Sequence, residues 1–161
     1  MRGTLLVPAG LLCVVACHLG PRFAQFGPAH APEGVRVEAS VASSSAPRAR
    51  TDVDGELLEV REEGLLVLGV LVEVREEGRK QVRMQPSDGR KRVVLVPFNG
   101  IQKARFEGTG RRCELRDGIV PTAGVRQRLR LVSRFPQGLA PDLLRRLLEI
   151  QGQAEIQRVG P

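Results

Sequence analysis

Between residues 51 and 135 the chain alternates short apolar runs with turn residues, at intervals typical of antiparallel strands. Glycine follows Glu, Asp or Asn at most of these turns, where it supplies the positive φ that a tight turn needs. We therefore predict a mainly β fold, a small antiparallel barrel or sandwich. The expected strands cover residues 56–61, 65–74, 81–84, 92–96, 101–106 and 126–135.

One of these runs has no polar position. Residues 93–96 read Val-Val-Leu-Val, so we expect a central strand that is covered on both faces. Pro97 follows, and because proline has no N–H to donate, it is expected to end that strand. Residues 57–64 recur nearly unchanged at 71–78, and we interpret this repeat as two strands with the same turn chemistry.

Near the C-terminus the apolar period changes to that of an α-helix. Pro141 suits a first helical position, Asp142 suits the positive end of the helix dipole, and Gly152 supplies a stop. The sequence thus predicts a C-terminal α-helix that packs on the sheet, with a groove for a partner helix as the alternative. Its apolar stripe consists of Leu143, Leu144, Leu147 and Leu148, with Gln151 at the end.

Segments 55–60, 64–68 and 94–106 together resemble an Sm-like or SH3-like barrel. Segment 94–106 is similar to the barrel half of ribosome maturation factor P. In that family a strand ending in an aliphatic-Pro pair leads through a single turn into Ile-x-x-Ala-Arg-aliphatic. The resemblance implies a barrel of short strands. Such barrels serve many unrelated functions, so it implies little about activity.

The N-terminus carries an apolar stretch, residues 4–16, behind Arg2. It is too short for a bilayer core of ~30 Å, which takes about 20 residues of helix, and it has the length of a signal-peptide core. It ends in Val-Val-Ala followed by Cys17, which resembles the lipobox of bacterial lipoproteins. That resemblance implies cleavage before Cys17 and membrane anchoring by acyl chains on it. An apolar N-terminus packed into the fold is the alternative.

Residues 18–50 are rich in Pro, Ala, Ser and Gly, a composition that buries too little apolar surface to fold by itself. We expect a tether, although residues 35–41 alternate in a way that suits a short strand joining the domain. The expected organisation is a signal peptide at 1–16, lipidated Cys17 and tether at 17–50, a β-rich domain at 51–135, and a helix and tail at 136–161.

The chain has a formal net charge of +7, and its basic residues form groups within the expected domain. If these groups share one exposed face, they would attract phosphate or another anion. Scattered, solvated charges are the alternative. The candidate anion or partner contacts are Lys103, Arg105, Arg111, Arg112, Arg126, Arg128 and Arg130.

The sequence shows no set of residues of the kinds that catalysis requires. Both histidines, His18 and His30, fall in the expected tether. Cys113 has arginine neighbours but no histidine in the domain to act as its base, so we expect a buried thiol on a strand. No Cys-x-x-Cys is present for zinc, and no glycine-rich loop for phosphate. We therefore expect no enzyme, no cofactor and no metal.

Two functions follow from these patterns. The first is a non-enzymatic binding or assembly module of the bacterial cell envelope, held in a membrane by lipid on Cys17. His18 after the cysteine implies the outer membrane, facing the periplasm, and the partner would be an envelope protein or polymer. The second is a cytosolic Sm-like nucleic-acid-binding protein. An exported chain is not expected to meet nucleic acid, so the first seventeen residues discriminate the two.

Overall fold

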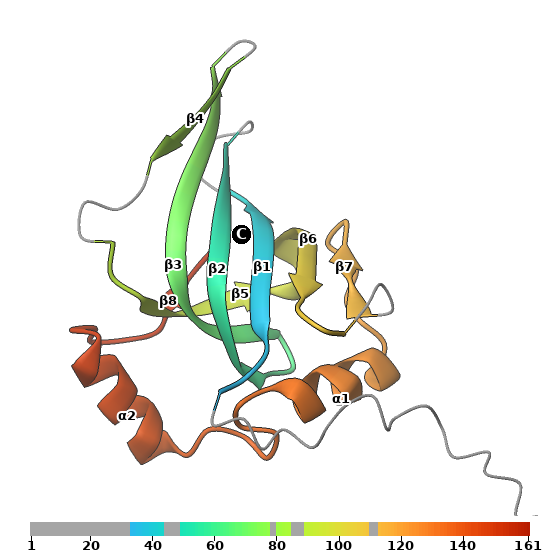
Figure 1. Cartoon of the computed structure of the whole chain (residues 1–161), viewed down its shortest axis with the longest axis vertical. Coiled ribbons are helices and arrows are strands. Elements are labelled where there is room, and N and C mark those ends of the chain that lie inside the picture. The colour runs from blue at the N-terminus through green and yellow to red at the C-terminus, as the bar shows by residue number, and fades with distance from the viewer. Residues whose placement is uncertain (1–32, 44–48, 78–79, 85–88, 110–112) are drawn as a thin grey trace, which may run out of the picture.

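A computed structural model describes residues 33–43, 49–77, 80–84, 89–109 and 113–161. The fold is mainly β and includes a C-terminal α-helix, as predicted (Figure 1). The predicted signal peptide, Cys17 and most of the tether lie outside the described residues. The strands are β1 (Arg36–Ala42), β2 (Ala49–Val60), β3 (Gly64–Glu77), β4 (Lys80–Met84), β5 (Arg92–Pro97), β6 (Ile101–Phe106), β7 (Leu115–Arg116) and β8 (Gln157–Arg158). The helices are η2 (Phe98–Gly100), α1 (Ala123–Val132) and α2 (Pro141–Ile150).

All eight strands in the described residues belong to one sheet in the order β7-β6-β1-β2-β3-β5-β8, with β4 paired to β3. Every pair is antiparallel except β5 with β8. Strands β5 and β6 are separated in this order by β1, β2 and β3, yet the three residues of η2 join them in sequence. The sheet must therefore roll up until these two strands meet at their ends, although β7 and β8 leave it open rather than closed.

A pair of glycines lies within the β2–β3 pairing. Gly55 on β2 is directly opposite Gly69 on β3. A Cβ on Gly55 would lie 2.3 Å from the Leu68 carbonyl oxygen, and one on Gly69 would lie 2.6 Å from that of Asp54. The two strands therefore approach more closely than side chains allow, which is the usual reason for glycine inside a strand.

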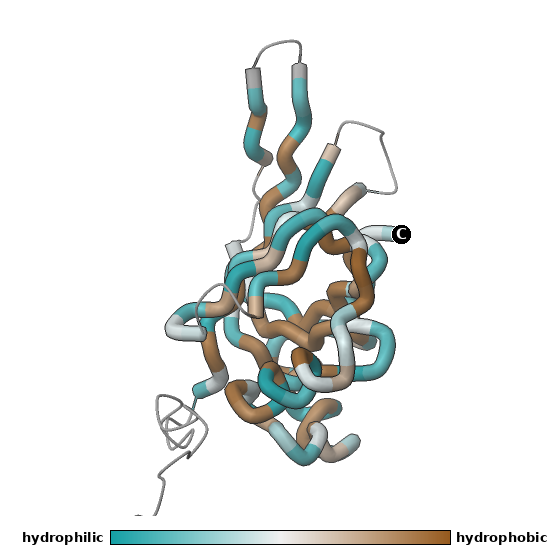
Figure 2. Tube along the Cα trace, turned by 90° about the vertical axis from the view of Figure 1, so that its right-hand side faces the viewer, coloured by the Kyte–Doolittle hydropathy of each residue, from teal (hydrophilic) through white to brown (hydrophobic). Residues whose placement is uncertain are grey.

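Hydrophobic and hydrophilic residues alternate along much of the trace (Figure 2), and the buried hydrophobic residues form two clusters on opposite faces of the sheet. The interior core, inside the rolled sheet, includes Leu57, Val67, Val94 and Phe98. A smaller outer cluster lies on the opposite face beneath α2. It consists of Leu58, Leu66, Val93, Leu139 and Leu148, with Leu68, Phe135, Leu144, Leu147 and Ile156 partly buried around them.

Strand β5 confirms the prediction made from its uninterrupted apolar run. Val94 and Val96 face the interior core, while Val93 faces the outer cluster, and all three are fully buried. The strand lies between β3 and β8 and ends at Pro97, as expected. The turn η2 then leads into β6, so the strand, turn and strand expected for 94–106 are present. The family resemblance built on them stays a prediction.

Helix α2 also confirms its prediction. Pro141 occupies its first turn beside Asp142, and the helix ends before Gly152, whose φ is +65°. Leu148 is buried, and Leu144 and Leu147 are half-buried against the outer cluster. The packing on the sheet that the apolar stripe predicted is thus observed for these three leucines, whereas Leu143 is exposed.

The strand predicted at 126–135 is wrong, because most of this segment forms helix α1. Arg126, Arg128 and Arg130 are spaced two residues apart, which is also the period of a β-strand. What decides the conformation is a second spacing, Val125, Leu129 and Val132, which places three apolar side chains on one helical face. Leu129 is fully buried in the interior core, with Val125 packed beside it.

Two predicted boundaries also need correction. The domain begins before residue 51, because β1 starts at Arg36 and lies between β2 and β6. The strand considered for residues 35–41 is therefore a central one. The C-terminal tail is likewise part of the sheet, since β8 pairs with β5 and Val159 is buried in the interior core.

Candidate functional site

A carboxylate surrounded by basic side chains lies at the β6–β7 end of the sheet. Arg116 Nη2 is 2.6 Å, Arg105 Nε 3.4 Å and Lys103 Nζ 3.8 Å from the nearest oxygen of Glu114. Lys103 and Arg105 are two residues apart on β6, so they share one face, and Lys103 is directly opposite Arg116. The hydrogen bond from Arg116, supported by Arg105 and Lys103, lowers the pKa of the Glu114 carboxyl, against desolvation that raises it.

This cluster brings together two of the seven predicted contact residues and adds one that the sequence analysis missed. Arg116 lies beside the turn at Asp117, and only the pairing of β7 with β6 reveals its place in the cluster. Three basic side chains around one acid leave a local excess of positive charge. The Glu114 side chain is only 11% exposed, whereas the three basic side chains around it are more exposed and face the solvent.

A second carboxylate binds two of the arginines of α1. Arg126 and Arg130 are four residues apart and therefore on one side of the helix, and both reach Glu62 in the β2–β3 turn. The distances are 2.7 Å from Arg126 Nη1 and 3.1 Å from Arg130 Nη2. Arg128 lies on another side, where its Nε donates to the Gly124 carbonyl at 3.2 Å.

The predicted contact residues therefore do not form a single site. Lys103 and Arg105 gather at Glu114, whereas Arg126 and Arg130 gather at Glu62. Arg111 and Arg112 lie outside the described residues. A phosphate footprint that needs all the groups on one face is not present in the described part of the chain.

The outer face of β1 and β2 carries further ion pairs. Arg36 meets Asp54 through two hydrogen bonds, Nε to Oδ1 at 2.8 Å and Nη2 to Oδ2 at 2.6 Å. The Arg36 hydrogen bond lowers the pKa of Asp54, with a smaller contribution from Lys91, and Asp54 in turn raises the pKa of Arg36. Nearby, Ser40 Oγ donates to Asp52 at 2.7 Å.

The residues considered for chemistry lie apart from one another. Cys113 is buried in the interior core with 1% exposure, next to β7 rather than on it. Buried Ser133 donates its hydroxyl to the Arg130 carbonyl at the end of α1, which is a structural role. Both histidines lie outside the described residues. Among the residues that the structure does describe, no three His, Cys, Asp or Glu side chains are grouped to hold a metal ion.

The end of the β3–β4 hairpin projects from the body of the sheet (Figure 1). We call β4, together with residues 73–77 of β3 that pair with it, the arm. Of the described strands, only β3 pairs with β4, and residues 81–84 are all exposed. Val82 and Met84, two residues apart, present apolar side chains on one side of this edge strand.

At the other end of the molecule, apolar side chains are exposed around the two helices. Ile119 and Val120, which lead into α1, are 68% and 57% exposed, and Leu131 on α1 is 49% exposed. Leu143 and Ile150 are exposed on α2. No helix within the described residues is long and apolar enough to cross a membrane.

Fold and surfaces together define a small, mainly β protein with an open rolled sheet and one helix on each of its faces. Compared with known proteins, the chain matches no family model, no curated protein and no solved structure.

Proposed function

We propose that the chain is a lipid-anchored, non-enzymatic binding module of the bacterial cell envelope. In this proposal the location in the envelope follows from the lipobox-like residues that end at Cys17. The observation that carries the binding role is the arm, whose edge strand β4 is paired on one side only in the described part of the chain.

An edge strand is suited to binding another protein through its backbone. In an antiparallel pair, alternate residues direct their N–H and C=O groups away from the partner strand. The outer side of β4 can therefore accept an added strand, a mode of recognition in which the backbone supplies affinity and alternate side chains supply specificity. Val82 and Met84 would contact the incoming strand, and exposed Arg83 on the other side would favour an acidic one.

The anchor is tested on the full-length chain produced in a bacterial host. We expect the intact mass of the membrane-fraction protein to correspond to a chain that begins at Cys17 and carries acyl groups. The Cys17→Ala variant should lose both the processing and the acyl mass. A soluble chain that still begins at Met1 would refute the lipoprotein.

The binding role is tested by photocrosslinking in living cells. A photoreactive residue replaces Gln81 on β4 and, as a matched control, Glu149 on the exposed side of α2. We expect a discrete crosslinked protein from position 81 and none from position 149, and we expect Val82→Glu with Met84→Glu to abolish it. Equal or absent crosslinking from the two positions would refute strand addition at the arm.

A nucleic-acid-binding protein of the cytosol is the second candidate, favoured by the three basic residues around Glu114. It requires an unprocessed chain and binding to an RNA oligonucleotide that weakens steeply with salt. Arg105→Glu with Arg116→Glu should then abolish that binding, whereas Arg145→Glu on α2 should not. Salt-insensitive or absent binding would leave the envelope module as the function.

A further inference from the structure

The described chain begins beside the end of α1. Val35 donates its backbone N–H to the Val132 carbonyl at 3.0 Å, and its own carbonyl accepts from Leu57 on β2 at 2.9 Å. Gly34 is held closely here, because a Cβ on it would lie 2.7 Å from the Arg134 nitrogen. Any segment that joins this domain to Cys17 therefore leaves it next to the C-terminal end of α1.

The outward side of α1 combines one exposed apolar residue with an arginine. Successive residues of a helix are turned by about 100°, so Leu131 lies nearly opposite the buried Leu129. Arg128 lies beside Leu131 on this outward side, whereas Arg130 lies toward Glu62, to which it is paired. The apolar pair Ile119 and Val120 precedes the same helix. We call the outward side of α1, together with this pair, the α1 face.

We propose that the α1 face rests on the anionic surface of the membrane that holds the lipid anchor; this inference depends on the proposed function. Helix α1 contains three arginines and no acidic residue, and two of them, Arg126 and Arg130, share the single carboxylate of Glu62. The helix with this partner therefore keeps a net positive charge, which complements anionic lipid headgroups. Leu131, Ile119 and Val120 are exposed apolar side chains that can enter the headgroup region.

The proposed lipid anchor allows such a small surface to bind. Two contacts that belong to one chain act at a mutual concentration on the order of millimolar, so a contact that is weak by itself becomes well populated. Because Val35 is bonded to Val132, the described chain begins directly beside the α1 face. One anchor and one basic, partly apolar patch are two signals, which together give stable attachment.

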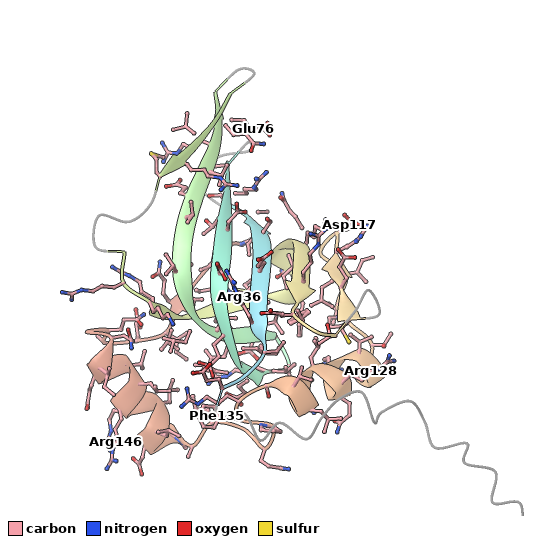
Figure 3. All side chains as sticks on the ribbon, viewed as in Figure 1. Arg36, Glu76, Asp117, Arg128, Phe135 and Arg146 are labelled. Carbon is pink, nitrogen blue, oxygen red and sulfur yellow. The ribbon has the colours of Figure 1, made fainter. Side chains whose placement is uncertain are left out.

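This orientation places the arm away from the membrane. In Figure 3, Arg128 and Arg146 lie at the end of the molecule where the two helices are, whereas Glu76 on β3 lies at the opposite end. A partner bound along β4 would then meet the domain at its far end and would not compete with lipid.

The experiment uses the lipidated full-length chain with one introduced thiol. Gln127→Cys places the thiol on the exposed outward side of α1, and Gln81→Cys on β4 is the matched control. A membrane-impermeant maleimide measures thiol exposure on vesicles of phosphatidylglycerol with phosphatidylcholine, on phosphatidylcholine vesicles, and in detergent. Cys113 is buried, so its failure to react also reports that each variant is folded.

We expect labelling at position 127 to be about fivefold slower on the anionic vesicles than in detergent. Labelling at position 81 should be equal in all three conditions. Adding Arg128→Glu and Leu131→Glu should restore fast labelling at 127, whereas Arg83→Glu with Val82→Glu, the same change of charge on β4, should not.

The outcomes separate this inference from the proposed function. A chain that carries acyl mass and stays on the vesicles, yet is labelled equally at 127 in all conditions, would refute the α1 face and leave the anchor intact. A chain without acyl mass would refute both. Protection of position 127 by an RNA oligonucleotide, with no effect of vesicles, would also overturn the membrane contact.

Discussion

Helices α1 and α2 both contain ten residues and cover opposite faces of the same sheet, but they are held differently. Helix α1 inserts Leu129 into the interior core, and two of its three arginines, Arg126 and Arg130, bind Glu62. Helix α2 lays a broader apolar stripe on the outer cluster, where Leu148 is 9% exposed. One helix is thus held by a single deeply buried side chain with ion pairs around it, and the other by several partly buried leucines.

The two helices also leave different side chains exposed to solvent. Helix α1 buries only Leu129, and its outward side carries Arg128 and the exposed Leu131. In α2 the apolar stripe is wider than the sheet can cover, so Leu143 and Ile150 stay exposed. Buried apolar side chains and surface ion pairs both hold a helix on the sheet. Substitutions can remove one kind of contact without the other.

Removing the Leu129 side chain is expected to have the largest effect. Leu129→Ala leaves a cavity in the interior core and should lower the free energy of unfolding by about 2–5 kcal/mol. Urea unfolding followed by circular dichroism measures it as a lower midpoint. Leu131→Ala, on the exposed side of the same helix, is the control and should cost under about 1 kcal/mol. Equal losses in the two variants would show that α1 is not held by burial.

The corresponding change in α2 should be smaller. Leu148→Ala removes a leucine at the edge of the outer cluster, with Leu144 and Leu147 remaining beside it, so we expect a loss of about 2 kcal/mol. The same urea titration compares it with Leu129→Ala. A loss larger than that of Leu129→Ala would reverse the comparison between the helices.

The Glu114 cluster provides a reference away from both helices. The pKa of Glu114 is lowered from its ordinary value of 4.5, so its ionised form favours the folded state. That stabilisation is complete above the unfolded pKa and is lost as the pH falls through the lowered, folded pKa. We expect Glu114→Gln to flatten the dependence of the melting temperature on pH below pH 4.5. An unchanged pH profile in this variant would contradict the pairing with Arg116.

The smallest effect is expected for the ion pairs of α1. Glu62 is 75% exposed, so Glu62→Gln should cost about 1 kcal/mol or less, and added salt should remove the difference. Neighbouring Glu63, also exposed, is the matched control and its change to Gln should cost still less. Melting temperatures at low and high salt measure both. A loss that persists at high salt would mean that these pairs, rather than Leu129, hold the helix.

How far the fold could be predicted depends on whether local and tertiary signals agree. Val93–Val96 form an uninterrupted apolar run and the leucine stripe of α2 has a single helical period, and both predictions are confirmed. Residues 125–132 carry two periods at once, and the conspicuous one, the arginines, is irrelevant to packing. The place of β1 was missed as part of the domain because its apolar residues are few, and Val37, Ala39 and Val41 matter only because β2 and β6 lie on either side.

The candidate surfaces were likewise predicted only in part from the sequence. The sequence by itself determined the apolar strands, the C-terminal helix and the positions of the basic residues, because these depend on periodicity and composition. Only the tertiary structure decided that Arg116 joins Lys103 and Arg105, that Arg126 and Arg130 bind Glu62, and that β4 keeps one side free of described strands. Such groupings depend on strand register and helix rotation, which arise when residues far apart in the chain pack together.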